Sequence, residues 1–233
     1  MEDKEQSLIT HLEELRKTLI ACFIALLVIL PFCFCVSNQM LDFLSKIIIG
    51  KNEITFNYFA PMEVFLLQLK LSFLADLVIC FPYIAHKLWM FILPALYENE
   101  RKFIFKTVFF SSTLFCLGAI FCIFCILPLI INFGMSFAQE NIKAVFGISN
   151  VINLALNLAF VFALCFQIPL IVHFLTKFDI VNKSSIENKR PYVVVVLLIF
   201  AALLTPPDII SQILLFVPVY LLFELGLLFS KSS

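Results

Sequence analysis

The sequence predicts an all-α integral membrane protein with six transmembrane helices and both termini in the cytoplasm. The first observation is composition: of 233 residues, 62% are hydrophobic and 14% are charged, whereas a soluble domain is about 45–50% apolar and about 25% charged. The second is a series of long apolar segments, most of them able to cross a hydrocarbon core of about 30 Å as helices. The third is the sorting of basic residues to one side.

The N-terminal residues 1–17 predict a cytoplasmic helix that lies on the bilayer and runs directly into the first span. Leu8, Leu12, Leu15 and Leu19 recur at spacings of four, three and four, which places them on one helical face. The whole chain, 1–233, is interpreted as one membrane domain. Its predicted spans cover about residues 18–36, 63–93, 106–133, 151–176, 191–207 and 209–229.

Polar segments connect these spans. Segments 38–60 and 134–150 are expected on the far side of the membrane, and the polar loop 177–190 on the cytoplasmic side. The sequence Thr-Pro-Pro-Asp at 205–208 predicts an abrupt turn, because two prolines cannot continue a helix. The fifth span has only 17 residues, about 25 Å at 1.5 Å per residue. A span this short predicts local thinning of the bilayer.

The orientation follows from the positions of Lys and Arg. Of the 16 basic residues, eleven fall on the side that holds both termini, three fall on the other side, and Lys70 and Lys87 lie within the second span. The excess of positive charge on cytoplasmic segments therefore places both termini inside the cell.

Composition also argues against several function classes. The net charge of +0 leaves no basic surface for nucleic acid. The eight cysteines all lie in apolar runs and are interpreted as small apolar filler, with a metal or disulfide role as the lesser alternative. No Glu-x-x-His pattern or His-rich cluster predicts a metal site, and no cofactor is expected. No cleavable signal peptide is expected either, so the first apolar run should remain as a span.

The turn between the second and third spans has the features of a docking site. Trp89 and Phe91 close an apolar run, Pro94 breaks it, and Glu98 and Glu100 follow before apolar sequence resumes at Phe103. Acidic side chains beside aromatic ones at the membrane surface suggest more than a connector.

Several short motifs, spread from end to end in a fixed order, resemble the TatC family, the six-span subunit of the twin-arginine protein translocase. They are Thr10–Lys17 (THLEELRK), Pro61–Phe65 (PMEVF) with Lys70, Leu88–Phe91 (LWMF), Pro94–Tyr97 (PALY), Glu100-Arg101, Lys189–Tyr192 (KRPY), Leu204–Asp208 (LTPPD), Ser211-Gln212 and Phe223-Glu224. Their order, the number of spans and the orientation together make the resemblance specific.

The resemblance implies recognition of folded export substrates through paired-arginine signal peptides, with transport powered by the proton gradient. It assigns signal-peptide binding to Glu14, Phe91, Leu96, Tyr97 and Glu100. It implies the single-span subunits TatA and TatB as partners on spans five and six, together with other TatC copies and membrane lipids. The implied location is the bacterial cytoplasmic (inner) membrane, where short span five is expected to aid passage of a folded substrate.

The two acids suit this chemistry, because an arginine presents a planar fork that carboxylates can meet bidentately. Without the resemblance, Glu100 would be interpreted as a pair with Arg101 or Lys102, and Glu14 as part of a solvated helix face. The resemblance favours binding for both.

Polar residues inside apolar segments are costly and usually mark function. Pro61 and Glu63 belong to the motif at the start of span two. Asp76 lies outside every motif, and both a structural pair across helices and a place in a wet groove are open. Gln167 stands where many family members carry Glu, so this side chain can hydrogen-bond but cannot titrate.

Two further acids lie near the ends of the last span. Asp208 is interpreted as a cap of the sixth helix, with a role in translocation as the alternative. Glu224 is expected to have a polar partner. A small-solute secondary transporter is the alternative function, but it needs polar groups that converge near the bilayer midplane. An intramembrane enzyme lacks a supporting constellation of residues.

Overall fold

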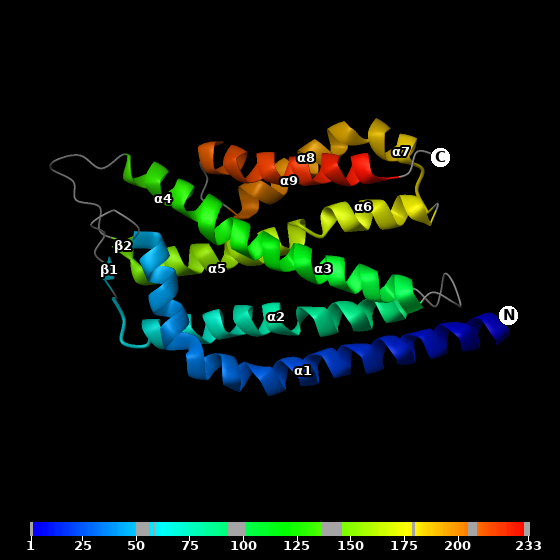
Figure 1. Cartoon of the computed structure of the whole chain (residues 1–233), viewed down its shortest axis with the longest axis horizontal. Coiled ribbons are helices and arrows are strands. Elements are labelled where there is room, and N and C mark those ends of the chain that lie inside the picture. Colours follow the sequence, from blue (N-terminus) through cyan, green and yellow to red (C-terminus); the bar gives the residue numbers. More distant parts are fainter. Residues whose placement is uncertain are drawn as a thin grey trace. The chain divides into compact units, whose positions relative to one another are not determined.

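The computed structural model describes residues 2–49, 56–57, 59–92, 101–136, 146–178, 180–204 and 209–230 (Figure 1). They form the elements α1 (Glu2–Ile49), β1 (Phe56–Asn57), α2 (Glu63–Ile92), α3 (Arg101–Phe121), the π-helix η1 (Cys122–Ile126), α4 (Leu127–Met135), β2 (Phe146–Gly147), α5 (Ile148–Cys165), α6 (Ile168–Lys177), α7 (Lys183–Asn188), α8 (Arg190–Leu204) and α9 (Ile209–Phe229).

Within these ranges, five helical stretches are long and apolar enough to cross a membrane. They are Leu12–Ile48, Glu63–Phe91, Phe105–Met135, Ile148–Lys177 and Gln212–Phe229. A sixth stretch, Arg190–Ala202 in α8, is apolar but shorter. The all-α membrane fold class is thereby confirmed, and α9 begins and ends where the sixth span was predicted.

Helix α1 extends further than the sequence indicated. The interfacial helix expected at 1–17, the span at 18–36 and part of the far-side segment 38–60 form one continuous helix that ends at Ile49. The extension follows from Leu41, Leu44 and Ile48, whose spacings of three and four place them on one buried face. Pro31 lies inside the helix without ending it.

Prolines interrupt the third and fourth spans. The third contains the π-helix η1 just before Pro128, and the N–H of Leu127 bonds to the carbonyl of Cys122. A proline clashes with the carbonyl four residues earlier, and the wider π turn accommodates that clash. The fourth span, expected as a single stretch over 151–176, is divided into α5 and α6 by a turn at Phe166-Gln167, just before Pro169.

The expected polar loop 177–190 also needs correction, because it contains the short helix α7. Its N-terminal Lys183 donates from Nζ to the carbonyl of Ser230 at 3.3 Å. Ile186 packs on the apolar cluster of Val172, Phe223 and Leu227. These contacts order a segment that its polar composition made look like a loop.

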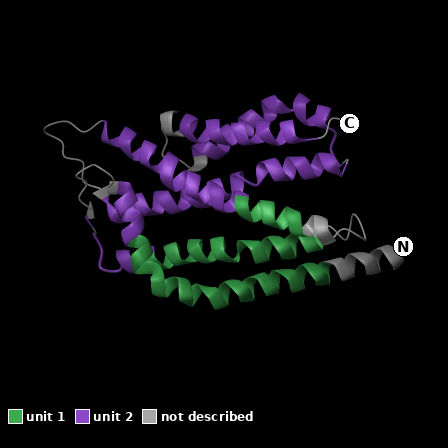
Figure 2. Cartoon of the chain, in the orientation of Figure 1, with its two compact units in different colours: residues 1–41, 68–113 green, residues 42–67, 114–233 purple. Residues whose placement is uncertain are grey.

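The chain divides into two compact units (Figure 2). The first, residues 1–41 and 68–113, contains most of α1 and α2. Positions further along α1 have partners that lie earlier on α2: Cys22 lies near Lys87, Cys33 lies near Asp76, and the Gln68 amide donates to Oδ1 of Asn38. The two helices therefore form an antiparallel pair.

The second unit comprises residues 42–67 and 114–233. Helix α9 packs on α6 and α8, and α5 packs on η1. Strands β1 and β2 form a short parallel pair in which Phe56 lies opposite Phe146. Because these strands come from the two segments predicted on the far side, their pairing agrees with that arrangement.

Candidate functional site

The structure describes two of the five residues that the sequence assigned to peptide binding. Glu14 lies on α1 and is exposed, and Phe91 lies in the last turn of α2 and is half-buried. Leu96, Tyr97 and Glu100 fall outside the described residues. In the antiparallel pair, Cys22 and Lys87 are neighbours. The N-terminal part of α1 that carries Glu14 therefore lies at the same end of the pair as Phe91.

Apolar side chains are exposed at this end of the α1–α2 pair. Leu12 is 62% exposed and Leu19 54% exposed on α1, and Met90 is 51% exposed on α2. Sequence reasoning interpreted the leucine face of α1 only as a contact with the bilayer and did not single out Met90. A carboxylate among exposed apolar side chains can bind a ligand that combines positive charge with an apolar segment.

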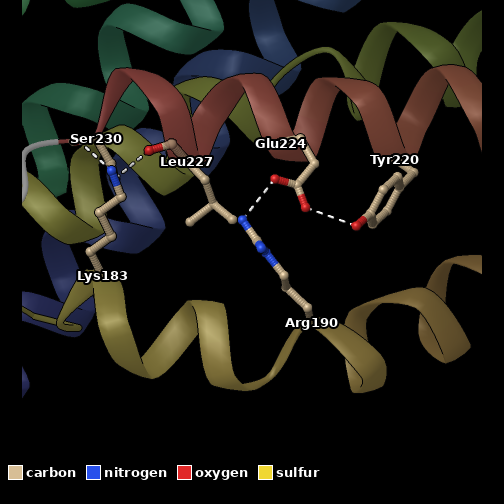
Figure 3. A network of polar contacts seen from close by, with 6 residues as sticks. All are labelled: Lys183, Arg190, Tyr220, Glu224, Leu227 and Ser230. Carbon is tan, nitrogen blue, oxygen red and sulfur yellow. Dashed lines mark hydrogen bonds and ion pairs between the residues drawn. The ribbon is translucent and has the colours of Figure 1, made fainter.

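A second polar site joins α8 to α9 (Figure 3). Arg190 donates from Nη2 to Oε2 of Glu224 at 3.0 Å, and the hydroxyl of Tyr220 donates to Oε1 at 2.8 Å. The polar partner expected for Glu224 is thus confirmed, and there are two of them. Tyr220 lies one helical turn before Glu224, a spacing from which this contact could have been predicted.

The same end of α9 is held by α6 and α7. Nδ1 of His173 lies 3.1 Å from the carbonyl of Phe229, and Lys183 reaches the carbonyl of Ser230. The last carbonyls of a helix lack partners within the helix, so basic side chains at this point satisfy them and interact favourably with the helix dipole. The segment 177–190 and the C-terminal end of α9 therefore lie together, which agrees with the prediction that both are on the cytoplasmic side of the membrane.

Glu63 holds the opposite, far-side region. Its Oε2 accepts hydrogen bonds from the backbone N–H groups of Phe59 at 2.7 Å and Ala60 at 3.2 Å. Ser149, in the first turn of α5, hydrogen-bonds Glu63 through both its backbone and its side chain. Pro61 lies in the exposed turn that these bonds close. Glu63 thus ties the start of α2 to the start of α5.

The remaining intramembrane candidates differ in their surroundings. Asp76 is fully buried in α2, and Gln167 is 9% exposed at the break between α5 and α6. The N–H of Gln167 bonds to the carbonyl of Leu164, and its carbonyl accepts from Ile171. Asp208 lies outside the described residues. Within the described ranges, no group of three or more His, Cys, Asp or Glu is arranged to hold a metal ion.

These features define a class of protein: a multi-span helical membrane protein with polar contacts that join the ends of its helices. Comparison with known proteins then places the chain within that class. The family model described as Sec-independent protein translocase protein (TatC) matches residues 10–218. The chain belongs to this family. It is a component of a protein translocase and a multi-pass protein of the bacterial inner membrane.

Relatives and solved structures agree with this assignment. The chain is 35% identical to Sec-independent protein translocase protein TatC of Haemophilus influenzae, over 98% of this chain and 90% of that protein. It is also 35% identical to the Escherichia coli K12 protein of the same name, over 97% and 88% of the two chains. A crystal structure described as the twin arginine translocase receptor TatC in DDM superposes with a TM-score of 0.88 at 29% identity, covering 95% of this chain and 99% of that one.

Proposed function

We propose that this chain, acting as one membrane domain over 1–233, is the receptor subunit that binds twin-arginine signal peptides of folded proteins. Glu14 and Glu100 accept the two guanidinium groups, and Phe91, Leu96 and Tyr97 hold the neighbouring apolar part of the peptide. The chain assembles with TatA- and TatB-type subunits for export driven by the proton gradient. Binding and assembly here involve no covalent chemistry of the chain itself.

One observation carries this proposal: the exposed Glu14 lies at the end of the α1–α2 pair where Phe91 and exposed Leu12 and Met90 also lie. An isolated exposed ion pair contributes only about 0–1 kcal/mol. A signal peptide that also buries apolar side chains gains about 25 cal/mol for each Å² removed from water. The apolar surroundings therefore supply affinity, and the acids supply the preference for arginine.

The test is peptide binding to the purified full chain, with a twin-arginine peptide and its Lys-Lys counterpart. We expect Glu14→Gln and Glu100→Gln each to weaken binding of the twin-arginine peptide up to about fivefold, the equivalent of about 1 kcal/mol. Binding of the Lys-Lys peptide should change less, because Lys lacks the planar fork that pairs bidentately with a carboxylate.

Glu13 supplies the matched control. It is exposed and precedes Glu14 on the same helix, so it points about 100° away around the helix axis. Glu13→Gln removes the same charge and should leave the ratio between the two peptides unchanged. If Glu13→Gln and Glu14→Gln weaken both peptides equally, the contact is a general charge effect and the direct arginine contact is refuted.

Exposed apolar rows on α8 and α9 support the assignment of the single-span partners to this part of the chain. On α9, Ile213, Val217, Leu221 and Leu225 recur every four residues and are all exposed. A photo-crosslinking amino acid at Val217 should form an adduct with a single-span subunit. One at Phe109, which is also exposed but lies on α3, should not. Equal adducts at both positions would contradict the assignment.

A further inference from the structure

Asp76 is the intramembrane acid that the proposed function does not use. It lies near the middle of α2, and its side chain is fully buried. Oδ1 accepts a hydrogen bond from the Cys80 thiol, one turn further along α2, with an Sγ to Oδ1 distance of 3.2 Å. Within the described part of the chain, Oδ2 has no hydrogen-bond partner.

The polar groups that can be placed near Asp76 in the described ranges are one hydroxyl and two thiols. On α2, Ser72, Asp76 and Cys80 recur every four residues and are all buried, which places them along one face of the helix. The Ser72 hydroxyl donates to the carbonyl of Gln68 at 2.6 Å, so its proton does not point to the acid. On the facing helix α1, the buried Cys33 thiol lies near Asp76.

Of the lysines on α2, Lys70 precedes Asp76 by six residues and is exposed, and Lys87 follows Asp76 by eleven. Lys87 lies near Cys22, and its Nζ lies over the Tyr83 ring, 5.6 Å from the ring centroid, near the C-terminal end of α2. The remaining titratable neighbours, Cys80 and Cys33, are thiols. The structure gives Asp76 no ion pair within the ranges it describes. An aspartate side chain is also too short to carry its carboxylate from mid-helix to the membrane surface.

An unpaired carboxylate in apolar surroundings is strongly unfavourable, and such a group takes up a proton instead of remaining charged. A neighbouring cation or a set of hydrogen-bond donors would instead stabilise the charged carboxylate. The described surroundings of Asp76 offer one weak thiol donor to one of its two oxygens. The proton is the ligand that fits this site.

We infer that Asp76 is a proton-binding site built into the α1–α2 pair. In the packed pair the carboxyl is neutral, its carboxylate having taken a proton from hydronium and released water. Loss of that proton leaves a buried charge against Cys33 and Cys80, so the pair must loosen and admit water to solvate it. Proton occupancy and the packing of α1 on α2 are therefore coupled, and this coupling does not depend on peptide binding.

The test is an infrared difference spectrum of the purified full chain at neutral pH, wild type minus Asp76→Asn. Asparagine has nearly the same shape as the neutral acid and carries no titratable proton. We expect the wild type to show the carbonyl stretch of one neutral carboxylic acid, and the variant to lack it. Asp42→Asn is the matched control, because Asp42 is an exposed aspartate on α1. It should retain that band.

The inference is overturned if Asp76→Asn removes a carboxylate band and leaves the neutral acid bands unchanged. If Asp76→Asn does not fold, wild-type chain labelled with carbon-13 in its aspartate carboxyls answers the same question. The chain has five aspartates. A neutral acid band shifted by the label at neutral pH supports the site, and a spectrum with carboxylate bands alone refutes it.

Discussion

Gly118 marks the closest approach of two helices in the second unit, and replacing it with alanine tests that packing. A Cβ atom built at Gly118 of α3 would lie 2.6 Å from the carbonyl oxygen of Phe162 and 2.8 Å from the Cα of Ala163, both on α5. These are backbone atoms, which cannot rotate away. Small residues at helix interfaces in membranes allow such approach between backbones.

The size of the effect follows from these distances. To bring the closest contact from 2.6 Å to an ordinary 3.4 Å, α3 and α5 would have to separate by about 0.8 Å. That separation also loosens the contacts of Phe162, a fully buried side chain whose ring packs on Phe121. Overpacking of this kind costs about 1–3 kcal/mol. We therefore expect Gly118→Ala to lower the unfolding midpoint by about 4–8 °C, for a loss of about 2 kcal/mol.

The measurement is thermal unfolding of the purified chain in detergent, with Gly134→Ala as the matched control. A Cβ at Gly134, also in a helix, meets nothing within 4 Å. Alanine is favoured over glycine by about 1 kcal/mol inside a helix, so the control should be neutral or slightly stabilising. If Gly118→Ala unfolds at the same temperature as Gly134→Ala, the close contact between α3 and α5 does not exist in the folded protein.

Three further predictions follow from the polar ties and from the length of α8. Glu224→Ala should lower the unfolding midpoint by less than Gly118→Ala, because the Arg190 and Glu224 side chains are 44% and 25% exposed and water replaces part of the ion pair. Glu187→Ala, which removes an exposed acid on α7, should have no effect. Equal changes in the midpoint for Glu224→Ala and Glu187→Ala would argue against the network in Figure 3. Glu63→Ala removes the acceptor of the Phe59 and Ala60 N–H groups and should lower the midpoint, whereas Met62→Ala at an adjacent exposed position should not; unchanged unfolding of Glu63→Ala would show that the far-side tie carries no stability. Helix α8 has 15 residues, about 22 Å against a hydrocarbon core of about 30 Å, so it is expected to thin the bilayer locally. Four leucines inserted after Val196 should therefore reduce export of a twin-arginine substrate in cells. Export at the wild-type rate would show that local thinning does not contribute.

The sequence was informative where hydrophobicity alone decides structure. Apolar runs bounded by charge predicted helix α9 at both ends and helix α2 within a residue. It was less informative where backbone hydrogen bonding decides. The break at Phe166-Gln167 and the π turn before Pro128 depend on how each proline is accommodated, and a proline inside a membrane helix can also be tolerated without a break, as Pro31 is in α1.

The candidate sites show a similar limit. The position of Glu224 near the end of the last span indicated that the acid has a polar partner, but Arg190 lies 34 residues away in the chain and only packing of α8 on α9 brings them together. Glu63 was selected because of its motif. Its bonds from the Phe59 and Ala60 N–H groups are local, four and three residues away, whereas its bonds with Ser149 depend on how the start of α5 packs on the start of α2. Spacing along one helix can be obtained from sequence, but contacts between helices follow from the fold.

Three acids inside or beside the apolar helices differ in the hydrogen-bond donors that they have. That difference separates acids with a structural role from an acid that can change its charge. Glu63 accepts hydrogen bonds from two backbone N–H groups, and Glu224 accepts hydrogen bonds from a guanidinium and a phenol. Asp76 has one thiol on one oxygen. A carboxylate with strong donors keeps its charge as the surroundings change, whereas one without them gains or loses a proton when its solvation changes. Of these three acids, Asp76 is therefore the one whose charge can follow a movement of α1 against α2.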